Sequence, residues 1–247
     1  MAGGGGSARR GGRPRRTTGT PHHRPQSAGR APGRDARRVP APAETAPPLP
    51  PGPFRLGAVA GTTPGKWIDA WRSRLPGVEL ELIPLDVADQ RERLLSGELD
   101  AALVRLPLRR DDLHVIALYD EVPVVVCAAD SHLTAADELT VDDLAGEVVV
   151  RSRDAVIEVE VPGAVPAAFA PPETTEDAIA TVATGIGVTI VPMSLARLHH
   201  RKDVDYRPLP EGPVSTVALA WPSEAPSALV DVFVGIVRGR TANSSRG

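Results

Sequence analysis

The sequence predicts an α/β fold of two small lobes, preceded by a disordered N-terminal tail. Strands and helices alternate from residue 54 onward, and residues 174–192 combine a capped helix, a glycine turn and a buried strand. The first 53 residues contain almost no aliphatic run. They leave roughly 190 of the 247 residues for the ordered part, which is enough for the cores of two small lobes.

The tail, residues 1–53, differs from the remainder in charge and composition. It carries ten arginines, no lysine and two acidic residues, a balance of +8, whereas the remainder has 18 basic and 29 acidic residues. It also holds 11 of the 26 prolines. Such a segment buries too little apolar surface to offset the entropy lost on ordering, so we expect it to be disordered. We also expect residues 240–247 to be flexible.

The ordered part begins with an apolar strand over residues 54–59 and a helix that ends near Leu75. Thr63 suits the N-cap of this helix, because Pro64 then takes the first helical position. Apolar residues recur at helical spacing and predict one buried face: Trp67, Ile68, Trp71 and Leu75.

A strand over residues 78–85, a helix over 89–96 and a strand over 101–106 extend this start into a βαβαβ unit with parallel strands. The later elements are less regularly spaced. Strands are predicted over 114–119, 122–128, 147–150 and 214–221, a helical turn at 142–144, and helices over 194–200 and 225–238. Residues 152–172 form an irregular stretch that contains prolines.

Residues 174–192 carry the clearest local pattern. Thr174 precedes two acidic residues and suits a helix N-cap. Apolar residues at i, i+3 and i+4 form one helix face, Gly185 and Gly187 end the helix, and a short apolar strand follows. A helix N-terminus beside a strand end can hold a small anion or polar ligand. The pattern therefore indicates binding and not catalysis.

Several classes of function lack their sequence signatures. No nucleophile elbow, P-loop or Cys/His metal motif occurs, so we expect no enzyme activity, cofactor or metal. The run His199-His200-Arg201-Lys202 is interpreted as cations near a helix C-terminus. The single Cys127 lies in an apolar run and predicts a buried structural thiol, which fits a reducing cytoplasm. Without a secretory signal or an apolar stretch of roughly 20 residues, we expect a cytoplasmic protein with no membrane contact.

Four segments, in this order, resemble the effector-binding domain of LysR-type transcriptional regulators, a relative of type 2 periplasmic binding proteins. They are residues 54–82, LLSGELDAALVRLP (94–107), residues 122–147 and VATGIGVTIVPMSLA (182–196). The resemblance implies two Rossmann-like lobes joined by two crossing strands, with an effector held between them. It places lobe I at about 54–123 and 219–239, and lobe II at about 124–218.

The sequence differs from the family in two places. It has neither the helix-turn-helix nor the linker helix with which the family usually begins, and the Arg/Pro/Gly-rich tail stands there instead. Residues 152–173 are also shorter and richer in proline than the segment that usually forms a helix in lobe II.

For lobe I, the resemblance implies that Thr62 and Thr63, in the loop after the first strand, contact the effector. The alternative is plain helix capping by Thr63. Arg105 ends the third strand, where it would face the cleft and pair with a carboxylate effector. The alternative is a surface arginine in a loop that also contains Arg109 and Arg110.

For lobe II, the corresponding candidates are Thr174 and Thr175 at the matching helix start, with capping again as the alternative. Arg151, which follows a predicted strand, is a further candidate for effector contact. In the tail, Gly12, Arg13, Pro14 and Arg15 resemble an AT-hook, which inserts arginine into a narrow A·T minor groove. The alternative is a coding bias towards arginine, proline, glycine and alanine, which produces such strings by chance.

Together these features predict the small-molecule effector-binding domain of a LysR-like transcriptional regulator. We expect a carboxylate or other anion as effector, a homodimer as is usual in the family, and DNA contact through the tail or a partner regulator. The alternatives are a ligand-free dimerisation or interaction module, a solute-binding protein of transport, and an enzyme on the same fold. An enzyme would need acid–base or nucleophilic groups that converge on the cleft.

Overall fold

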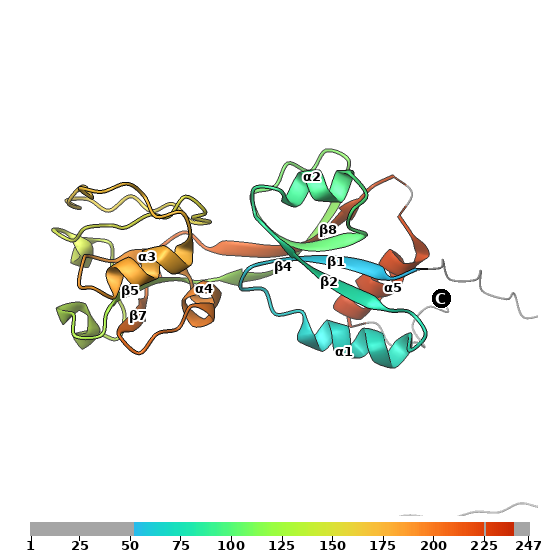
Figure 1. The fold of residues 1–247 in the computed structure, drawn as a ribbon, viewed down its shortest axis with the longest axis horizontal. Coiled ribbons are helices and arrows are strands. Elements are labelled where there is room, and N and C mark those ends of the chain that lie inside the picture. The colour runs from blue at the N-terminus through green and yellow to red at the C-terminus, as the bar shows by residue number, and fades with distance from the viewer. Residues whose placement is uncertain (1–51, 225, 240–247) are drawn as a thin grey trace, which may run out of the picture. The chain divides into compact units, whose positions relative to one another are not determined.

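The structure, a computed structural model, describes residues 52–224 and 226–239, and these contain two β-sheets (Figure 1). Sheet A has the strand order β2 (Leu80–Leu85), β1 (Phe54–Val59), β3 (Ala101–Arg105), β8 (Ser215–Pro222) and β4 (Leu113–Glu121). Sheet B has the order β6 (Thr189–Pro192), β5 (Pro123–Ala128) and β7 (Val204–Pro208). The helices are α1 (Gly65–Arg74), α2 (Gln90–Leu95), α3 (Thr175–Val182), α4 (Met193–Leu198) and α5 (Ala228–Val237).

The predicted βαβαβ unit is confirmed in sheet A. Strand β1 pairs in parallel with β2 on one side and with β3 on the other. The sheet then continues with two antiparallel pairings, β3 with β8 and β8 with β4. Helices α1 and α5 cover one face of the sheet and α2 covers the other (Figure 1). We call this sheet with its helices lobe I.

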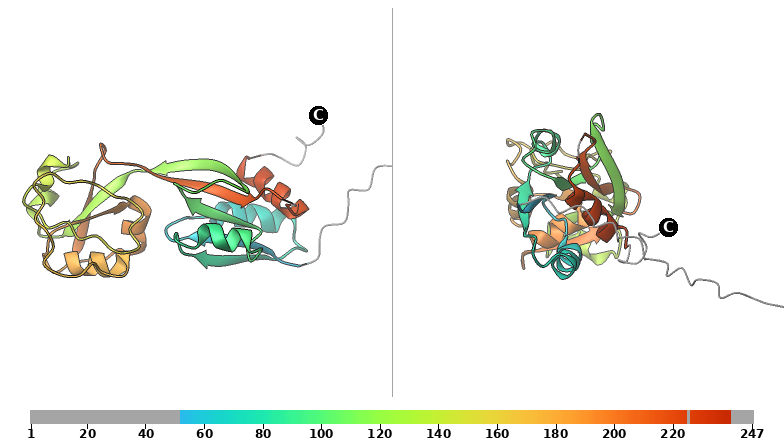
Figure 2. Two further views of the ribbon diagram at one scale, coloured as in Figure 1. Left: turned by 90° about the horizontal axis from the view of Figure 1, so that it is seen from above. Right: turned by 90° about the vertical axis from the view of Figure 1, so that its right-hand side faces the viewer.

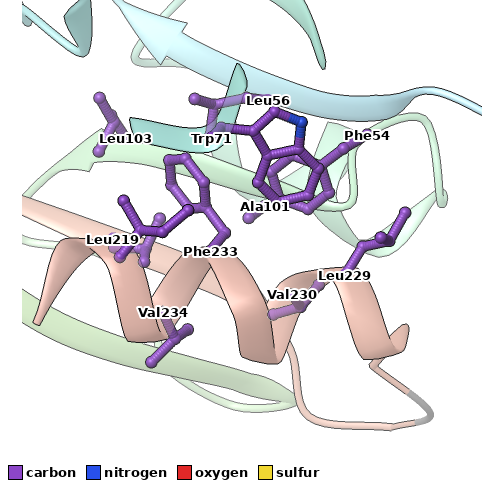
Figure 3. Close-up of a cluster of buried hydrophobic side chains, with 11 residues drawn as sticks. Phe54, Leu56, Trp71, Ala101, Leu103, Leu219, Leu229, Val230, Phe233 and Val234 are labelled. Carbon is purple, nitrogen blue, oxygen red and sulfur yellow. The ribbon is translucent and has the colours of Figure 1, made fainter. Parts of the chain in front are cut away.

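An aromatic cluster lies at the centre of the core between sheet A and helices α1 and α5 (Figure 3). The Phe54 ring stacks on Trp71 with centroids 4.6 Å apart, and Phe233 lies 5.2 Å from Phe54. The buried indole N–H of Trp71 donates to the Val78 carbonyl at 3.0 Å, so no polar group is left unpaired there. The cluster joins residues from β1, α1 and α5 into one core.

Sheet B and the elements that pack on it form lobe II. Its central strand β5 is buried along its whole length and pairs antiparallel with β6 and β7. Cys127 on this strand is fully buried, as predicted, and burial raises the pKa of its thiol. Helix α3 packs on the sheet through Ile179. The segment between Arg151 and Thr174 contains no helix or strand, in agreement with its irregular prediction.

Two chain segments pass between the sheets (Figures 1 and 2). Strand β4 ends at Glu121 and β5 begins at Pro123, whereas the return runs from β7 to β8, which begins at Ser215. The two crossing strands inferred from the resemblance are therefore β4 and β8. The residue boundaries given above for the two lobes stay a prediction.

Three local predictions differ from the structure. The N-cap of α1 is Pro64 and has no side-chain cap hydrogen bond, so the predicted capping by Thr63 is wrong. Residues 147–150 form only isolated bridges, in which Val149 pairs with Val188, instead of a strand. Strand β7 was not predicted, because it depends on pairing with β5 and not on a strong apolar alternation of its own.

Gly187 is required by the turn between α3 and β6. Its φ is +65°, and a Cβ at this position would overlap the carbonyl oxygen of Val148. The same carbonyl accepts the N–H of Val188 at 2.8 Å, so the turn brings the backbone at Gly187 and Val188 against the backbone at Val148.

The AT-hook-like residues Gly12, Arg13, Pro14 and Arg15 lie outside the described residues, as do residues 240–247. Within the described ranges, no helix has both the length and the apolar character needed to cross a membrane.

We expect Phe233→Ala to lower the free energy of unfolding by about 3–5 kcal/mol, because it leaves a cavity beside Phe54 and Trp71. Urea denaturation followed by tryptophan fluorescence measures the loss. Phe169→Ala, at a side chain that is 39% exposed, is the matched control and should cost under about 1 kcal/mol. Equal losses in the two variants would contradict the described core.

Candidate functional site

Arg105, at the end of β3, is only 2% exposed. Both terminal nitrogens of its guanidinium group donate hydrogen bonds within the chain. Nη1 donates to Glu121 Oε2 and to Ser215 Oγ, both at 2.7 Å. Nη2 donates to the Ala60 carbonyl at 3.2 Å and to Ser194 Oγ at 3.1 Å. The buried Nε has no partner among the described residues. We call these five residues the Arg105 cluster.

The Arg105 cluster joins the two lobes. Ala60 follows β1 and Arg105 ends β3, whereas Ser194 belongs to α4 of lobe II. Glu121 and Ser215 stand at the ends of the crossing strands β4 and β8. The Ser194 hydroxyl also donates to Glu121 Oε2 at 2.9 Å, which closes the network. The cluster therefore links lobe I, helix α4 of lobe II and the two crossing strands.

The backbone of Arg105 is fixed from α2. Gln90 is 4% exposed and accepts the Arg105 N–H through Oε1 at 3.0 Å. Its Nε2 donates to the Arg105 carbonyl at 2.9 Å. Both backbone groups at the end of β3 are thus satisfied by one side chain, which holds the guanidinium in place.

Gly61 gives the loop after β1 its close approach to lobe II. Its φ is +83°, and a Cβ there would lie 2.5 Å from Ser194 Oγ and 3.1 Å from Leu195 Cδ2. A side chain would therefore push α4 away from the Arg105 cluster.

Tyr119 on β4 borders the same region. Burial raises the pKa of its phenol above the ordinary value, and the nearby Glu121 carboxylate raises it further. The smaller opposing effects come from the charge of Arg105 and a hydrogen bond with the Thr63 backbone. Tyr119 therefore stays a neutral hydroxyl at physiological pH.

A cleft of about 510 Å³ lies beside the Arg105 cluster and is lined by both lobes. Lobe I contributes Ala60, Leu85, Asp86, Val87, Ala88 and Arg105. The polar lining residues of lobe II are Arg153, Asp154, Glu173, Thr175 and His199. A volume of this size suits a small organic molecule.

The N-terminus of α3 reaches this cleft and is already bonded to a carboxylate. Asp154 Oδ2 accepts the Thr175 N–H at 3.0 Å, and Oδ1 accepts the Thr175 hydroxyl at 2.9 Å. The predicted cap is confirmed at the preceding residue, where Thr174 Oγ1 accepts the Asp177 N–H at 3.1 Å. The N–H of Thr175, at the helix start where the sequence suggested a ligand, is thus already bonded within the chain.

Of the six predicted effector contacts, the structure brings two into this cleft, Arg105 and Thr175. Thr62 lies outside the lining set, and its hydroxyl donates to the Val59 carbonyl at 2.7 Å. Thr63 and Thr174 are exposed and also lie outside it. Which residues contact an effector stays a prediction.

Arg151 is not among the residues that line the cleft. Its Nη2 donates to the Val159 carbonyl, and its side chain lines a separate hollow of about 270 Å³ in lobe II. The exposed Phe169 lines the same hollow.

Sequence reasoning missed most of the charged groups around the cleft. Asp86 directly follows β2, and this position at the end of a strand is the sequence signal that could have identified it as a cleft-lining residue. Arg153, Asp154 and Glu173 lie in the irregular segment, where no periodicity indicates which side chains meet. Arg153 Nε donates to Glu173 Oε1 at 2.8 Å, and both side chains are more than half exposed.

No group of three or more His, Cys, Asp or Glu side chains in the described ranges has the geometry to hold a metal ion. His199 Nδ1 lies 3.9 Å from Glu176 Oε2 and lines the cleft. The arrangement offers hydrogen bonds, charges and apolar surface for binding.

Comparison with known proteins gives consistent results. The family model of the LysR substrate binding domain matches residues 49–242. The Hca operon transcriptional activator HcaR of Escherichia coli (strain K12) is 33% identical over 192 residues, which cover 72% of this chain and 63% of that protein. The chain thus spans a little under two thirds of the length of this curated relative.

Solved structures share the fold. The reduced form of the OxyR regulatory domain from Pseudomonas aeruginosa has a TM-score of 0.59 at 24% identity, covering 76% of this chain and 97% of that chain. The BenM effector binding domain with its effector benzoate has a TM-score of 0.61 at 20% identity, covering 77% of this chain and 95% of that chain.

We expect Arg105→Ala to lower the free energy of unfolding by about 3–5 kcal/mol, because Glu121, whose side chain is only 10% exposed, loses its counter-charge. Replacing both residues by apolar ones, Arg105→Met with Glu121→Leu, should recover most of the loss, because no unpaired charge is left buried. Chemical denaturation measures both.

Arg153→Ala serves as the control, since its ion pair with Glu173 is exposed and should contribute under about 1 kcal/mol. A similar small cost for Arg105→Ala would show that the Arg105 cluster does not support the fold.

Proposed function

This chain belongs to the LysR substrate binding domain family, and from that premise we propose that it binds a small-molecule effector in the cleft beside the Arg105 cluster. The observation that supports this most directly is the lining itself: about 510 Å³ of space bordered by side chains of both lobes. A ligand that contacts two lobes at once interacts differently with their open and closed arrangements. Its binding therefore shifts the equilibrium between them.

The effector response passes through the crossing strands. Glu121 and Ser215 stand at their ends and share Arg105 with Ser194 of lobe II. A change in the angle between the lobes that moves Ser194 away from Arg105 and Glu121 breaks two of these bonds, so the Arg105 cluster favours the arrangement in which they form. Arg105 and Thr175 are the two predicted contacts that line the cleft, and we propose both as part of its wall.

We also propose that the domain serves a transcriptional regulator. The relative HcaR is described as a transcriptional activator, and this chain covers 63% of its length. In this proposal the chain acts as a homodimer in the cytoplasm. DNA contact comes through the tail around Arg13 or through a partner regulator.

We expect saturable stabilisation of the 247-residue chain by at least one compound in a panel of small organic molecules. An excess of about 100 times the Kd should add about 2.7 kcal/mol to the free energy of unfolding. Ala155→Trp, at an exposed cleft-lining alanine, should remove this stabilisation because the indole fills the cleft.

Ala167→Trp makes the same change at an exposed alanine of the separate hollow in lobe II and should leave the stabilisation unchanged. Thermal melting with and without each compound measures both variants. Stabilisation that survives Ala155→Trp but disappears in Ala167→Trp would move the site to the second hollow. A broad panel without any effect would contradict the proposed function.

A further inference from the structure

We propose that this cleft selects a neutral or positively charged effector and discriminates against carboxylates, with Asp154 as the residue that determines the specificity. The inference rests on the proposed function, because it assigns a chemical class to the effector of that same cleft. It differs from the anionic effector that Arg105 alone would suggest.

Arg105 has no terminal N–H left for a ligand. Each of its two Nη atoms carries two hydrogens, and four acceptors within the chain take them. The remaining donor, Nε, is buried. A ligand carboxylate could pair with this group only by displacing one of these four acceptors, and it would then lie close to the Glu121 carboxylate, which is 2.7 Å from Nη1.

Asp154 occupies the second position at which a carboxylate would be expected. Helix α3 has eight residues, and its first N–H groups carry the partial positive charge of the helix dipole. Asp154 accepts both the N–H and the hydroxyl of Thr175, which is 3% exposed. The chain thus supplies its own anion at the helix N-terminus, and a second anion there meets a like charge.

The charges around the cleft favour hydrogen-bond donors on the ligand. Its lining includes three carboxylates, Asp86, Asp154 and Glu173, against the two arginines. Arg105 is paired with Glu121 and Arg153 with Glu173, and His199 lies 3.9 Å from Glu176.

Among the residues that the structure describes, Asp86 and Asp154 have no basic side chain within 4.0 Å. Both carboxylates therefore remain able to accept from an amine, an amidine or a primary amide.

The rest of the lining is apolar. Leu85 and Val87 come from lobe I, and Val156 and Leu195 come from lobe II. An effector that fits this surface combines a small apolar body with a donor group that meets Asp86 or Asp154. Aromatic or aliphatic amines and amides have this form.

The test compares ligands that share one body and differ only in charge. Benzoate, benzamide and benzylamine form one such set, and phenylacetate, phenylacetamide and phenethylamine form another. Thermal melting and calorimetric titration of the 247-residue chain at probe concentrations up to about 10 mM detect weak binding. We expect the amide or amine of a set to bind at least about tenfold more tightly than its carboxylate.

Two substitutions separate the charge of Asp154 from its place on the helix. Asp154→Asn keeps a hydrogen-bonding group beside Thr175 and removes the charge, whereas Asp154→Ala also frees the Thr175 N–H. Affinity for the carboxylate probes should rise in Asp154→Asn by about tenfold, and further in Asp154→Ala. Asp137→Asn, at an exposed residue of lobe II outside the cleft lining, makes the same change in net charge and should have no effect.

The outcomes are distinct. Tighter binding of the carboxylates to the unsubstituted chain would overturn the proposal, as would an unchanged order of affinities in both Asp154 variants. Equal effects from Asp137→Asn would assign the discrimination to net charge and also overturn the role of Asp154. Failure of every probe together with failure of the broad panel would instead refute the proposed function on which the inference rests. Failure of every probe when a carboxylate of the broad panel binds would overturn the present proposal alone.

Discussion

The buried ion pair between Arg105 and Glu121 is the constraint on which the rest of the structure depends. A charge pair this deep in the protein is tolerated only when the remaining donors and acceptors are also satisfied. Ser194, Ser215 and the Ala60 carbonyl complete the set. Because these groups belong to both lobes and to both crossing strands, satisfying one guanidinium fixes where all of these elements meet.

The same constraint decides the chemistry of the neighbouring cleft. An arginine that holds the lobes together has no terminal N–H to offer a ligand. The other lining residues therefore determine which chemical groups the cleft can bind. Asp86 and Asp154 have no ion-pair partner in the described chain, and the helix N-terminus at Thr175 is already neutralised. A position that looks cationic in the sequence is therefore balanced in the folded protein, and the cleft beside it is acidic.

Lobe II lines the cleft although it contains little regular secondary structure. Its sheet has three strands, and the segment between Arg151 and Thr174 has no regular element. This segment still supplies Arg153, Asp154 and Glu173 to the cleft. Its backbone is held by contacts such as the bond from the Arg153 N–H to the Pro172 carbonyl, so an irregular chain can present defined side chains.

The sequence by itself determined the elements whose signals are local. The strand at residues 54–59 matches its prediction, and Thr174 caps α3 as its neighbouring acidic residues indicated, because caps and periodicity act over a few residues. Only the tertiary structure decided the partners of Arg105, since Ser215 lies 110 residues away along the chain. It likewise paired Asp154 with Thr175 at the start of α3, because a carboxylate in an irregular segment has no sequence period that reveals its contact. Long-range polar contacts follow from how whole elements pack, and no local pattern encodes them.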